Sequence, residues 1–424
     1  MGFFIEMNTE QLHQVFLSSS GICTDTRKVE DKNIFFAIKG ANFDGNSFAE
    51  EALQRGCSFA VIDNFEQKKD DRYIVVKNVL DTLHELARYH REKLNCPVIG
   101  ITGTNGKTTT KELILLVLSS QFKTIATKGN LNNHIGVPLT LLSTPLDTEL
   151  LIVEMGANHQ GEISQLCKIA SPDYGIITNI GKAHLEGFGG YDGVIKAKSE
   201  LYQYIEKKEG WVFVNEKDEL LLSLSKNLNR IAYGENCAMS SCNPFVTLEY
   251  KQHIISSKMV GKYNFDNIVA ACCIGEYFGV TSKNYKKSIE SYQPTNNRSQ
   301  VEKTQRGNTL ILDAYNANPS SMLASINAFK ELEGTKKTVI LGDMLELGDD
   351  SIKEHQEIID HLKQSDIFTI YLVGSEFQKT KHNYLWFNSV KELGHYLEKN
   401  ALSENSILLK GSRKLQLEKL KAIL

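Results

Sequence analysis

The sequence predicts an α/β protein of three domains built around mainly parallel sheets. Its 424 residues correspond to about three domains at roughly 150 residues each. Short runs of apolar, β-branched residues alternate along the chain with helical patterns. Such continuous runs are typical of strands buried on both faces of a parallel sheet. Strands that alternate with helices form βαβ units, in which functional residues follow the carboxyl ends of the strands.

The expected strands fall in the second and third parts of the chain. Each is short and apolar, ends in Gly, Asn or Asp, and is followed by a helical pattern, as in βαβ units. In order along the chain, these runs lie at 97–101, 150–153, 174–178, 211–214, 309–312, 338–341, 369–373 and 407–409.

The positions of the prolines indicate where the domains meet. None of the seven precedes Pro97, and another lies in the polar stretch 293–297. Polar segments that contain proline are typical of linkers between domains. We therefore expect an N-terminal domain over residues 1–85, a central domain over 86–295 and a C-terminal domain over 296–424.

The balance of charges argues against a broadly basic protein that binds nucleic acid. Lys and Arg number 48, Asp and Glu number 51, and the net charge of -3 is compatible only with a local basic pocket. No apolar run approaches the roughly 18–20 residues of a membrane helix, and the N-terminal stretch lacks the pattern of a signal peptide. The eight cysteines are scattered along a large chain, so a disulfide framework is not expected and we expect a protein of the reducing cytoplasm. We also expect it to be a monomer.

A phosphate-binding loop is the strongest local signal. The segment 100–109 reads GITGTNGKTT, with an apolar strand before it and a helical pattern after it. Its glycines let successive backbone N–H groups face one anion, and the helix N-terminus adds partial positive charge. Lys107 would reach the β- and γ-phosphates of a nucleotide, and the Thr108 hydroxyl would ligate Mg²⁺. The strict motif has Gly where Ile101 stands, so this loop is a variant.

An acidic residue and a histidine follow the next two expected strands. Glu154 comes directly after 150–153, where a Mg²⁺ ligand that complements a phosphate loop is expected. The alternative is a solvated carboxylate at a strand end. His184 lies beyond 174–178, and this strand–loop edge indicates a metal- or phosphate-binding role. Other histidines, such as His90, are expected to be surface or satisfied polar residues.

Several longer segments surround these residues. They read TDTR at 24–27, FFAIKG at 35–40, DG at 44–45, GNLNNHIGVP at 129–138, EMGAN at 154–158, GEI at 161–163, DAYNANPSSM at 313–322 and LGDMLELG at 341–348. Together with the loop TGTNGKT, they resemble the Mur ligase superfamily of ATP-dependent amide-bond-forming enzymes over essentially the whole chain. The last two segments are the most specific, and they are similar to the branch that adds D-alanyl-D-alanine.

The resemblance implies a fold and an activity. A smaller α/β N-terminal domain would hold the UDP end of the substrate. The central domain would be a parallel-sheet, ATPase-like domain with the phosphate loop, and a Rossmann-like C-terminal domain would close on ATP and bind the dipeptide. The implied reaction joins D-alanyl-D-alanine to UDP-N-acetylmuramoyl-tripeptide through an acyl phosphate. It uses ATP and two Mg²⁺ ions and serves peptidoglycan synthesis, and with it cell shape and division.

The resemblance also implies roles for individual residues. The catalytic set would be Lys107, Glu154, His184 and Lys198, with Lys198 on a helix and carbamylated. The Mg²⁺ ligands would be Thr108, Glu154, His184 and Lys198. Contacts to ATP would come from Gly103, Thr104, Asn105, Gly106, Lys107, Thr108, Thr109, Asn264, Asn267, Arg298 and Asp313. Contacts to the other substrates would come from Thr26, Arg27, Lys39, Asn133, Asn316 and Asn318.

Two sets of residues in the third domain could position the dipeptide. Asn316, Asn318 and Ser321 follow an expected strand end. Asn318 before Pro319 is also the pattern of a helix N-cap, and the two roles are compatible. The second set consists of strand-end and helix positions, namely Asp343, Glu346 and His355.

Three other classes of protein stay open at this point. A folylpolyglutamate synthase or an earlier Mur ligase would share the nucleotide site, although the segments at 316–319 and 341–348 argue against both. A phosphate-loop switch or motor would hydrolyse nucleotide without an amine acceptor. A catalytically silent scaffold would not need the four catalytic residues, which are intact. The third residue of the peptide substrate, diaminopimelate or lysine, is not specified by these patterns.

Overall fold

The computed structural model describes residues 7–295, 297–334, 336–365, 367 and 369–424. Residues 1–6, which begin the N-terminal stretch without a signal-peptide pattern, and position 296, the expected start of the third domain, lie outside the described residues. The described chain is a mixed α/β protein with two large, mainly parallel sheets, which confirms the predicted fold class.

The chain divides into two compact units. One consists of Met1–Gly100, Phe122–Gly156 and Glu162–Gly175, and the other of Ile101–Gln121, Ala157–Gly161 and Ile176–Leu424. The three-domain boundaries expected at 85 and 295 stay a prediction.

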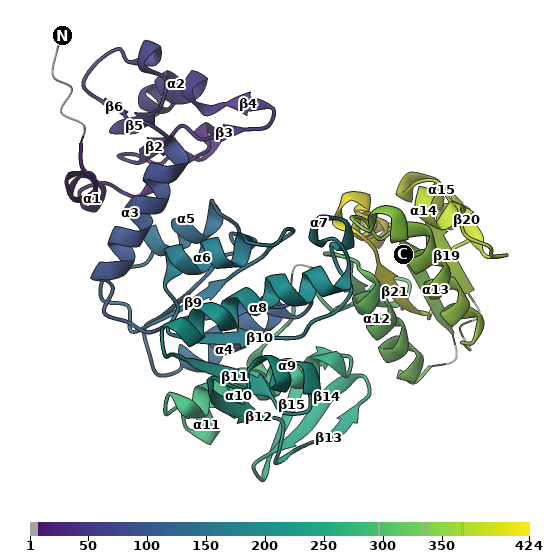
Figure 1. The fold of residues 1–424 in the computed structure, drawn as a ribbon. Coiled ribbons are helices and arrows are strands. Elements are labelled where there is room, and N and C mark those ends of the chain that lie inside the picture. Colours follow the sequence, from purple (N-terminus) through teal and green to yellow (C-terminus); the bar gives the residue numbers. More distant parts are fainter. Residues whose placement is uncertain (1–6, 296, 335, 366, 368) are drawn as a thin grey trace. The chain divides into compact units, whose positions relative to one another are not determined.

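A four-stranded parallel sheet of the order β1-β2-β5-β6 forms the N-terminal part (Figure 1). Its central strands are apolar and buried, and helix α2 packs against β5. The strands are β1 (Ile22–Cys23), β2 (Ile34–Phe36), β5 (Phe59–Ile62) and β6 (Tyr73–Val75), and a separate hairpin consists of β3 (Lys39–Gly40) and β4 (Phe43–Asp44). The helices are α1 (Thr9–Leu17), η1 (Thr26–Lys28), η2 (Gly45–Phe48), α2 (Ala49–Gln54), η3 (Phe65–Gln67) and α3 (Val79–Lys93).

Helix α1 packs on α3 through two buried histidines. Atom Nε2 of His13 lies 3.0 Å from Nδ1 of His90, and Nε2 of His90 donates to the carbonyl of Thr144 at 2.9 Å. Both side chains are 2% exposed, and burial lowers the pKa of each below its ordinary value. His90 is therefore a satisfied polar residue, as expected, although it is buried rather than on the surface.

The central sheet has the strand order β12-β11-β10-β7-β9-β8. All four strands expected in this part form, namely β7 (Val98–Thr102), β9 (Leu150–Glu154), β10 (Tyr174–Ile177) and β11 (Trp211–Asn215). The sequence patterns missed the two edge strands, β8 (Thr124–Ala126) and β12 (Asn229–Tyr233). Strand β8 is short and β12 is largely exposed, so neither has the continuous apolar run of a buried strand.

Helices connect these strands. They are α4 (Lys107–Leu118), α5 (Gly136–Leu142), α6 (Glu162–Ala170), α7 (Leu185–Phe188), α8 (Tyr191–Lys207), α9 (Glu219–Leu224), α10 (Tyr263–Tyr277) and α11 (Ser282–Ser291). Helix α8 is amphipathic, because Val194, Ala197, Leu201 and Ile205 recur on one buried face. Across the described ranges, no helix combines the length and the apolar character that spanning a membrane demands.

A three-stranded antiparallel sheet packs on α10 and α11. Its strands are β13 (Cys237–Cys242), β14 (Phe245–Tyr250) and β15 (His253–Val260). We did not predict this sheet. Its turn between β14 and β15 places Lys251 and Gln252 at φ 46° and 68°, where hairpins usually have Asn or Gly. The sequence therefore lacks the turn signal, and only the alternating burial of β15 indicates a strand.

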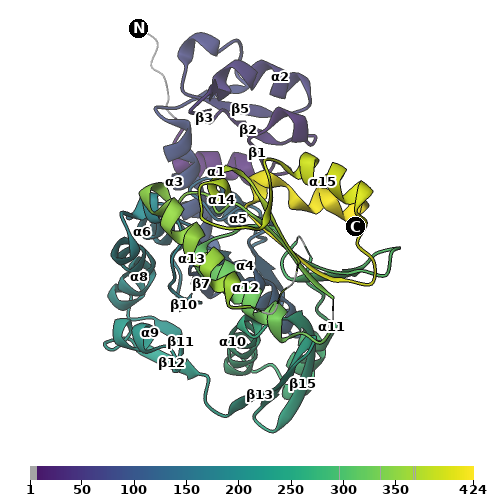
Figure 2. The same ribbon diagram turned by 90° about the vertical axis from the view of Figure 1, so that its right-hand side faces the viewer.

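The C-terminal part is a six-stranded sheet of the order β16-β17-β21-β18-β19-β20, parallel except for β16. Helices α12 and α13 pack together, and Figure 2 shows them on one side of the sheet and α15 on the other. The strands are β16 (Gln300–Lys303), β17 (Thr309–Asp313), β18 (Lys337–Gly342), β19 (Thr369–Val373), β20 (Leu385–Phe387) and β21 (Ser406–Lys410). The helices are α12 (Pro319–Glu331), η4 (Gly348–Asp350), α13 (Ser351–Lys363), α14 (Ser375–Gln378), α15 (Val390–Lys399), η5 (Arg413–Leu415) and η6 (Leu417–Ala422).

Candidate active site

The phosphate loop connects β7 to α4, as the sequence predicts. Gly103 and Gly106 have φ values of 146° and 79°, which favour glycine. A Cβ atom on Gly103 would lie 2.0 Å from Oγ1 of Thr178, and one on Gly106 would lie 2.7 Å from Oδ1 of Asn267. Both positions therefore exclude a side chain. Gly106 occupies the N-cap of α4, which leaves the positive end of this helix open to an anion.

The Lys107 ammonium group folds over the same loop. It donates to the carbonyls of Gly103 at 2.7 Å and Thr104 at 3.1 Å. Thr108 is 6% exposed and lies in the first turn of α4. The loop thus carries its cation and its hydroxyl at the start of the helix, where a nucleotide phosphate would bind.

The segment after β10 holds the phosphate loop in place. Oγ1 of Thr178 donates to the carbonyl of Asn105 at 2.6 Å, and the N–H of Asn105 donates to Oδ1 of Asn179 at 3.0 Å. The N–H of Gly181 donates to Oγ1 of Thr104 at 2.9 Å. The loop is therefore cross-linked on its 104–105 side to the segment that carries His184.

Two asparagines at the start of α10 reach α4. Oδ1 of Asn267 accepts from the hydroxyl of Thr110 at 3.0 Å, and Nδ2 of Asn267 donates to Oδ1 of Asn264 at 3.0 Å. Nδ2 of Asn264 in turn donates to the carbonyl of Val260 at 2.8 Å. Both amides are buried, so this chain of hydrogen bonds fixes α10 beside the helix that begins at the phosphate loop.

Glu154 ends β9 with its side chain buried. It is 1% exposed, and its Oε1 accepts from Nδ2 of Asn132 at 2.8 Å. Its backbone N–H donates to Oγ1 of Thr127 at 3.0 Å. Burial and fixed partners rule out the alternative that Glu154 is a solvated strand-end carboxylate.

Phe188 lies between His184 and Lys198. The Lys198 ammonium lies 5.1 Å from the centroid of the Phe188 ring, and the His184 and Phe188 ring centroids are 6.3 Å apart. Lys198 is 2% exposed on α8, so its side chain is buried rather than solvated on the helix surface. Burial lowers the pKa of His184, Glu346 opposes this shift by its negative charge, and Lys107 and Lys198 reinforce it.

His184 also contacts the C-terminal part, because its Nδ1 hydrogen-bonds to Glu346. Both residues have a left-handed backbone, with φ values of 51° and 63°, which is uncommon outside glycine. Within the described ranges, no three His, Cys, Asp or Glu side chains gather as metal ligands.

Lys182 makes a second contact of this kind, which the sequence analysis missed. Its ammonium lies 2.6 Å from Oε1 of Glu354 and 3.4 Å from Oε2 of Glu357. The Lys182 N–H donates to Oγ of Ser320 at 2.9 Å. The sequence gives no indication of this ion pair, because Glu354 on α13 lies 172 residues beyond Lys182.

Asn318 is the helix N-cap that its sequence pattern predicts, and its role toward the dipeptide stays a prediction. Its Oδ1 accepts from the N–H of Ser321 at 2.8 Å and caps α12, which starts at Pro319. Its Nδ2 donates to Oδ1 of Asn105 at 2.8 Å. The residue that starts this helix thus touches the tip of the phosphate loop.

Asp313 and Arg298 have partners in the C-terminal part. Asp313 accepts from the hydroxyl of Ser325 at 2.6 Å and from the ammonium of Lys410, which is 1% exposed, at 2.7 Å. The Arg298 guanidinium lies 3.7 Å from the centroid of the Tyr315 ring. The sequence analysis assigned no role to Lys410. Its position at the end of an apolar strand is nevertheless unusual, because lysine is almost never fully buried unless it is paired.

Asp343 and His355 are buried and have partners within the C-terminal part. The two carboxylate oxygens of Asp343 accept from the N–H groups of Glu376 at 2.9 Å and Phe377 at 3.0 Å. Nε2 of His355 accepts from the N–H of Met344 at 3.0 Å. Burial raises the pKa of Asp343 and lowers that of His355. These bonds fix the segment that leads to Glu346, and neither side chain lines the pocket described next.

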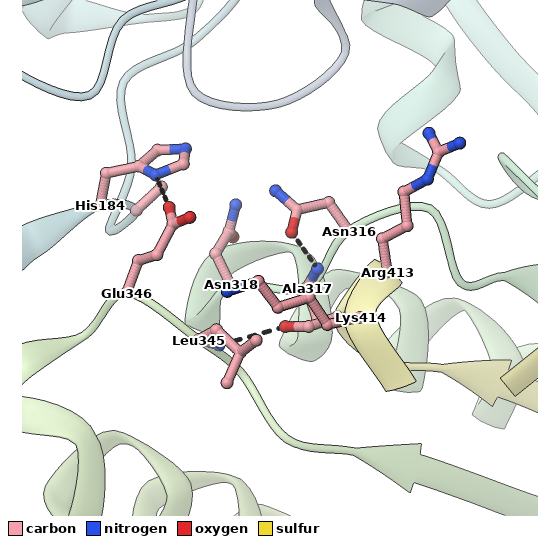
Figure 3. Close-up of a pocket in the computed structure, with 10 residues that line it drawn as sticks. His184, Asn316, Ala317, Asn318, Leu345, Glu346, Arg413 and Lys414 are labelled. Atoms are coloured by element: carbon pink, nitrogen blue, oxygen red, sulfur yellow. Dashed lines mark hydrogen bonds and ion pairs between the residues drawn. The ribbon is translucent and has the colours of Figure 1, made fainter. Parts of the chain in front are cut away.

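A pocket of about 110 Å³ opens between the His184 segment and the ends of the C-terminal strands. Figure 3 shows His184 and Glu346 on one side of it and Arg413 on the other, with Asn316 and Asn318 between them. Oδ1 of Asn316 accepts from the N–H of Ala317 at 2.9 Å. The lining residues are Ala183, His184, Asn316, Ala317, Asn318, Leu345, Glu346, Ser412, Arg413 and Lys414.

The remaining candidate residues lie in the compact unit that begins with the N-terminal sheet. Arg27 pairs with Asp25 at 2.8 Å and is mostly exposed, and Thr26 begins the same short helix, η1. Lys39 pairs with Asp63 at 2.9 Å. Oδ1 of Asn133 accepts from the N–H groups of the two residues that precede α5 and begin it, Ile135 and Gly136. Arg27, Lys39 and Asn133 therefore have partners within their own unit.

Comparison with known proteins agrees with this arrangement. The chain matches the Mur ligase middle domain over residues 101–275, the glutamate ligase domain of Mur ligases over 297–413 and the catalytic domain of the Mur ligase family over 18–99. The UDP-N-acetylmuramoyl-tripeptide--D-alanyl-D-alanine ligase of Bacillus subtilis is 36% identical over 94% of this chain and 92% of that protein.

Solved structures are similar over the same length. MurF from Acinetobacter baumannii superposes with a TM-score of 0.85 at 30% identity and covers 99% of both chains. MurF ligase from Thermotoga maritima, in complex with ADP, has a TM-score of 0.84 at 27% identity and covers 96% of this chain and 97% of that one. On this sequence identity, coverage and fold, the chain belongs to the Mur ligase family.

Proposed function

We propose that this chain is the ATP-dependent ligase that joins D-alanyl-D-alanine to UDP-N-acetylmuramoyl-tripeptide for peptidoglycan synthesis. The observation that carries the proposal is the junction between Asn318 and Asn105, which brings a pocket of the C-terminal part against the tip of the phosphate loop. A ligase needs its phosphate donor and its amine acceptor at adjacent sites. The named relatives are ligases of this specificity, and one related structure holds ADP.

The first half of the reaction is a transfer of phosphate. The terminal carboxylate of the tripeptide attacks the γ-phosphorus of ATP, and ADP leaves, which gives an acyl phosphate. Two anions must approach each other closely, so the site has to offset their repulsion. Lys107 and the N-terminus of α4 supply positive charge on this chain.

The second half forms the amide. The neutral amine of D-alanyl-D-alanine attacks the acyl carbon, phosphate leaves with its bridging oxygen, and the amine loses a proton. Water would destroy the acyl phosphate, so the site must close before the attack. The contacts of Asn318, Glu346 and Glu354 with the loops of the central sheet support this closing role for the C-terminal part.

We further propose that the site binds the two Mg²⁺ ions that the resemblance of the sequence implies. Thr108 and Glu154 offer buried oxygen donors, which Mg²⁺ prefers, and we propose that they serve one ion. His184 and Lys198 flank Phe188 and would serve the second, with Lys198 carbamylated so that it presents oxygen atoms. When bound, Mg²⁺ would neutralise charge on the phosphates. The remaining ATP contacts proposed here are those of Asn264, Asn267, Arg298 and Asp313.

We also propose which residues bind the UDP-muramoyl substrate. The N-terminal domain would hold the UDP end through Thr26, Arg27 and Lys39, and Asn133 would contact the peptide. We expect the enzyme to act as a monomer in the cytoplasm, which a sedimentation measurement of the purified chain and fractionation of cells would test.

Release of ADP tests the proposal. The purified chain is incubated with ATP, Mg²⁺ and UDP-N-acetylmuramoyl-tripeptide, with D-alanyl-D-alanine present or absent. ADP release that requires both acceptors, with a UDP-muramoyl-pentapeptide detected by mass, is the expected result. ADP release that ignores the dipeptide and yields no amide would overturn the proposal in favour of a phosphate-loop switch.

A further inference from the structure

The pocket has charges of opposite sign at its two ends. Glu346 lines it beside His184, and Arg413 and Lys414 line it on the other side. A dipeptide at neutral pH has the matching charges, an amino group at one end and a carboxylate at the other. The small volume of about 110 Å³, against roughly 300–1,000 Å³ for a pocket that holds a drug-sized ligand, favours a small molecule over a nucleotide.

The end of the pocket that faces the phosphate loop is fixed by hydrogen bonds. Asn318 lines the pocket and donates to Asn105 in the loop. The segment that carries His184 is also tied to the loop, because the N–H of Gly181 donates to Oγ1 of Thr104 at 2.9 Å. The transferred phosphate would sit on this loop, so an amine that attacks the acyl phosphate must enter from the His184 and Asn318 side. The carboxylate of the same dipeptide then points to the opposite side.

Arg413 stands on that opposite side. It is exposed, directly follows the buried Ser412, and its guanidinium lies 4.8 Å from the centroid of the Tyr315 ring. A guanidinium is planar, and a pair of its N–H groups matches the two oxygens of a carboxylate. Contact with the aromatic face restrains the orientation of that plane. The hydroxyl of Ser412 accepts from the N–H of Leu345 at 3.1 Å, so the backbone at the start of η5 is anchored to another wall of the pocket.

We propose that Arg413 binds the terminal carboxylate of the incoming dipeptide and so selects acceptors with a free carboxyl end. The proposal rests on the proposed function, since it needs the dipeptide as the second substrate. It orients D-alanyl-D-alanine with its amine toward His184 and the phosphate loop. Lys414, which also lines the pocket, would add positive charge without the planar fork of an arginine.

The test compares D-alanyl-D-alanine with D-alanyl-D-alaninamide, which has the same shape without the negative charge. The wild-type chain should use the amide with a kcat/KM lower by about 10- to 100-fold, the value of one charge-assisted pair of hydrogen bonds. Arg413→Ala should raise the KM for the free dipeptide by a similar factor. It should leave the KM values for the amide and for ATP within about twofold, and Arg413→Lys should fall between these cases.

Arg306→Ala is the matched control, because Arg306 is an exposed arginine of the same C-terminal part that does not line the pocket. It should preserve the preference for the free carboxylate. If Arg413→Ala raises the KM for ATP alone, the arginine binds the nucleotide. If it lowers kcat/KM equally for the dipeptide and its amide, the role of the arginine is structural. Loss of the preference in Lys414→Ala but not in Arg413→Ala would transfer the role to the lysine. Each of these results overturns the proposal.

These outcomes are separate from failure of the proposed function. If the wild-type chain forms no amide with D-alanyl-D-alanine under any condition, the ligase assignment fails first. If it forms the pentapeptide but uses the dipeptide and its amide equally well, the ligase assignment stands and the role of Arg413 is wrong.

Discussion

The ion pair between Lys182 and Glu354 gives a prediction whose size follows from the structure. Its atoms are 2.6 Å apart, Glu354 has 3% of its side chain exposed, and Lys182 has 40%. At this distance two unit charges attract by about 6 kcal/mol at an effective dielectric constant near 20. Desolvation of the carboxylate and the exposure of the lysine offset most of that. We expect a net value of about 1–2 kcal/mol, between those of exposed and fully buried pairs.

The two partners should not be equivalent. Lys182→Met leaves a buried carboxylate without this cation, while Glu354→Gln leaves a lysine that water can reach. The first change should therefore cost about 1–2 kcal/mol and the second less, and adding Glu354→Gln to Lys182→Met should restore part of the loss. The same order should appear in kcat, because Lys182 lies two residues before His184.

Urea unfolding followed by tryptophan fluorescence measures this effect. Trp211 lies in the central sheet and Trp386 in the C-terminal sheet, so the signal covers both sides of the contact. The exposed pair of Lys262 and Glu331, at 2.7 Å, provides the control, and Lys262→Met should leave the midpoint unchanged. If Lys182→Met and Lys262→Met behave alike, or if the double variant is no better than Lys182→Met, the reasoning from burial is refuted.

Three further predictions concern the nucleotide site and the N-terminal helix. Gly106→Ala places a Cβ atom 2.7 Å from Oδ1 of Asn267 at φ 79°, and it should reduce ADP affinity at least tenfold by calorimetry, because the loop must shift. Asn267→Leu leaves Oδ1 of Asn264 without its hydrogen-bond donor and the hydroxyl of Thr110 without its acceptor. It should cost about 1–3 kcal/mol in urea unfolding and weaken ADP binding. The pair of His13 and His90 should make stability fall in acid. Their folded pKa values lie below the ordinary 6.5, so the unfolded state binds more protons below that pH, and the stabilisation present above pH 6.5 is lost as pH falls toward the lowered values.

Each of these predictions has a control. Gly189 has a similar φ of 74° with open space around its Cβ position, so Gly189→Ala should keep ADP affinity, and equal losses in both variants would contradict the steric argument. Unchanged ADP affinity in Asn267→Leu would remove Asn267 from the nucleotide contacts. His253 is exposed, and His253→Gln should keep the wild-type pH dependence of the thermal midpoint. His90→Gln should flatten that dependence between pH 7.5 and 5.5, and an unaltered slope would show that other groups cause it.

Much of the fold follows from local patterns. The eight expected strands form, because a strand buried on both faces leaves an unbroken apolar run, as in β9 and β19. The phosphate loop can also be predicted from the sequence, because the local backbone geometry at Gly103 and Gly106 requires glycine. The antiparallel sheet β13–β15 was missed because its turn at Lys251 and Gln252 has no glycine, and alternating strands give a weaker signal than continuous ones.

The contacts between distant segments could not be read in this way. Glu354 is one of many charged residues on a helix, and its burial depends on Lys182, 172 residues away. Lys198 reads as a surface lysine, and only the fold places it beside Phe188. Arg413 enters the site because β21 ends at the pocket. A sequence pattern reports neighbours along the chain, whereas these side chains become neighbours only when the sheet order is fixed.

Transfer of a labelled oxygen tests the central claim most directly. UDP-N-acetylmuramoyl-tripeptide is prepared with ¹⁸O in its terminal carboxylate and incubated with ATP, Mg²⁺, D-alanyl-D-alanine and the wild-type chain. Both products are then weighed by mass spectrometry. An acyl phosphate requires that one labelled oxygen leave with inorganic phosphate and the other stay in the new amide of the pentapeptide. Phosphate without label, or labelled tripeptide recovered intact beside ADP, would contradict the assignment of this chain as a ligase.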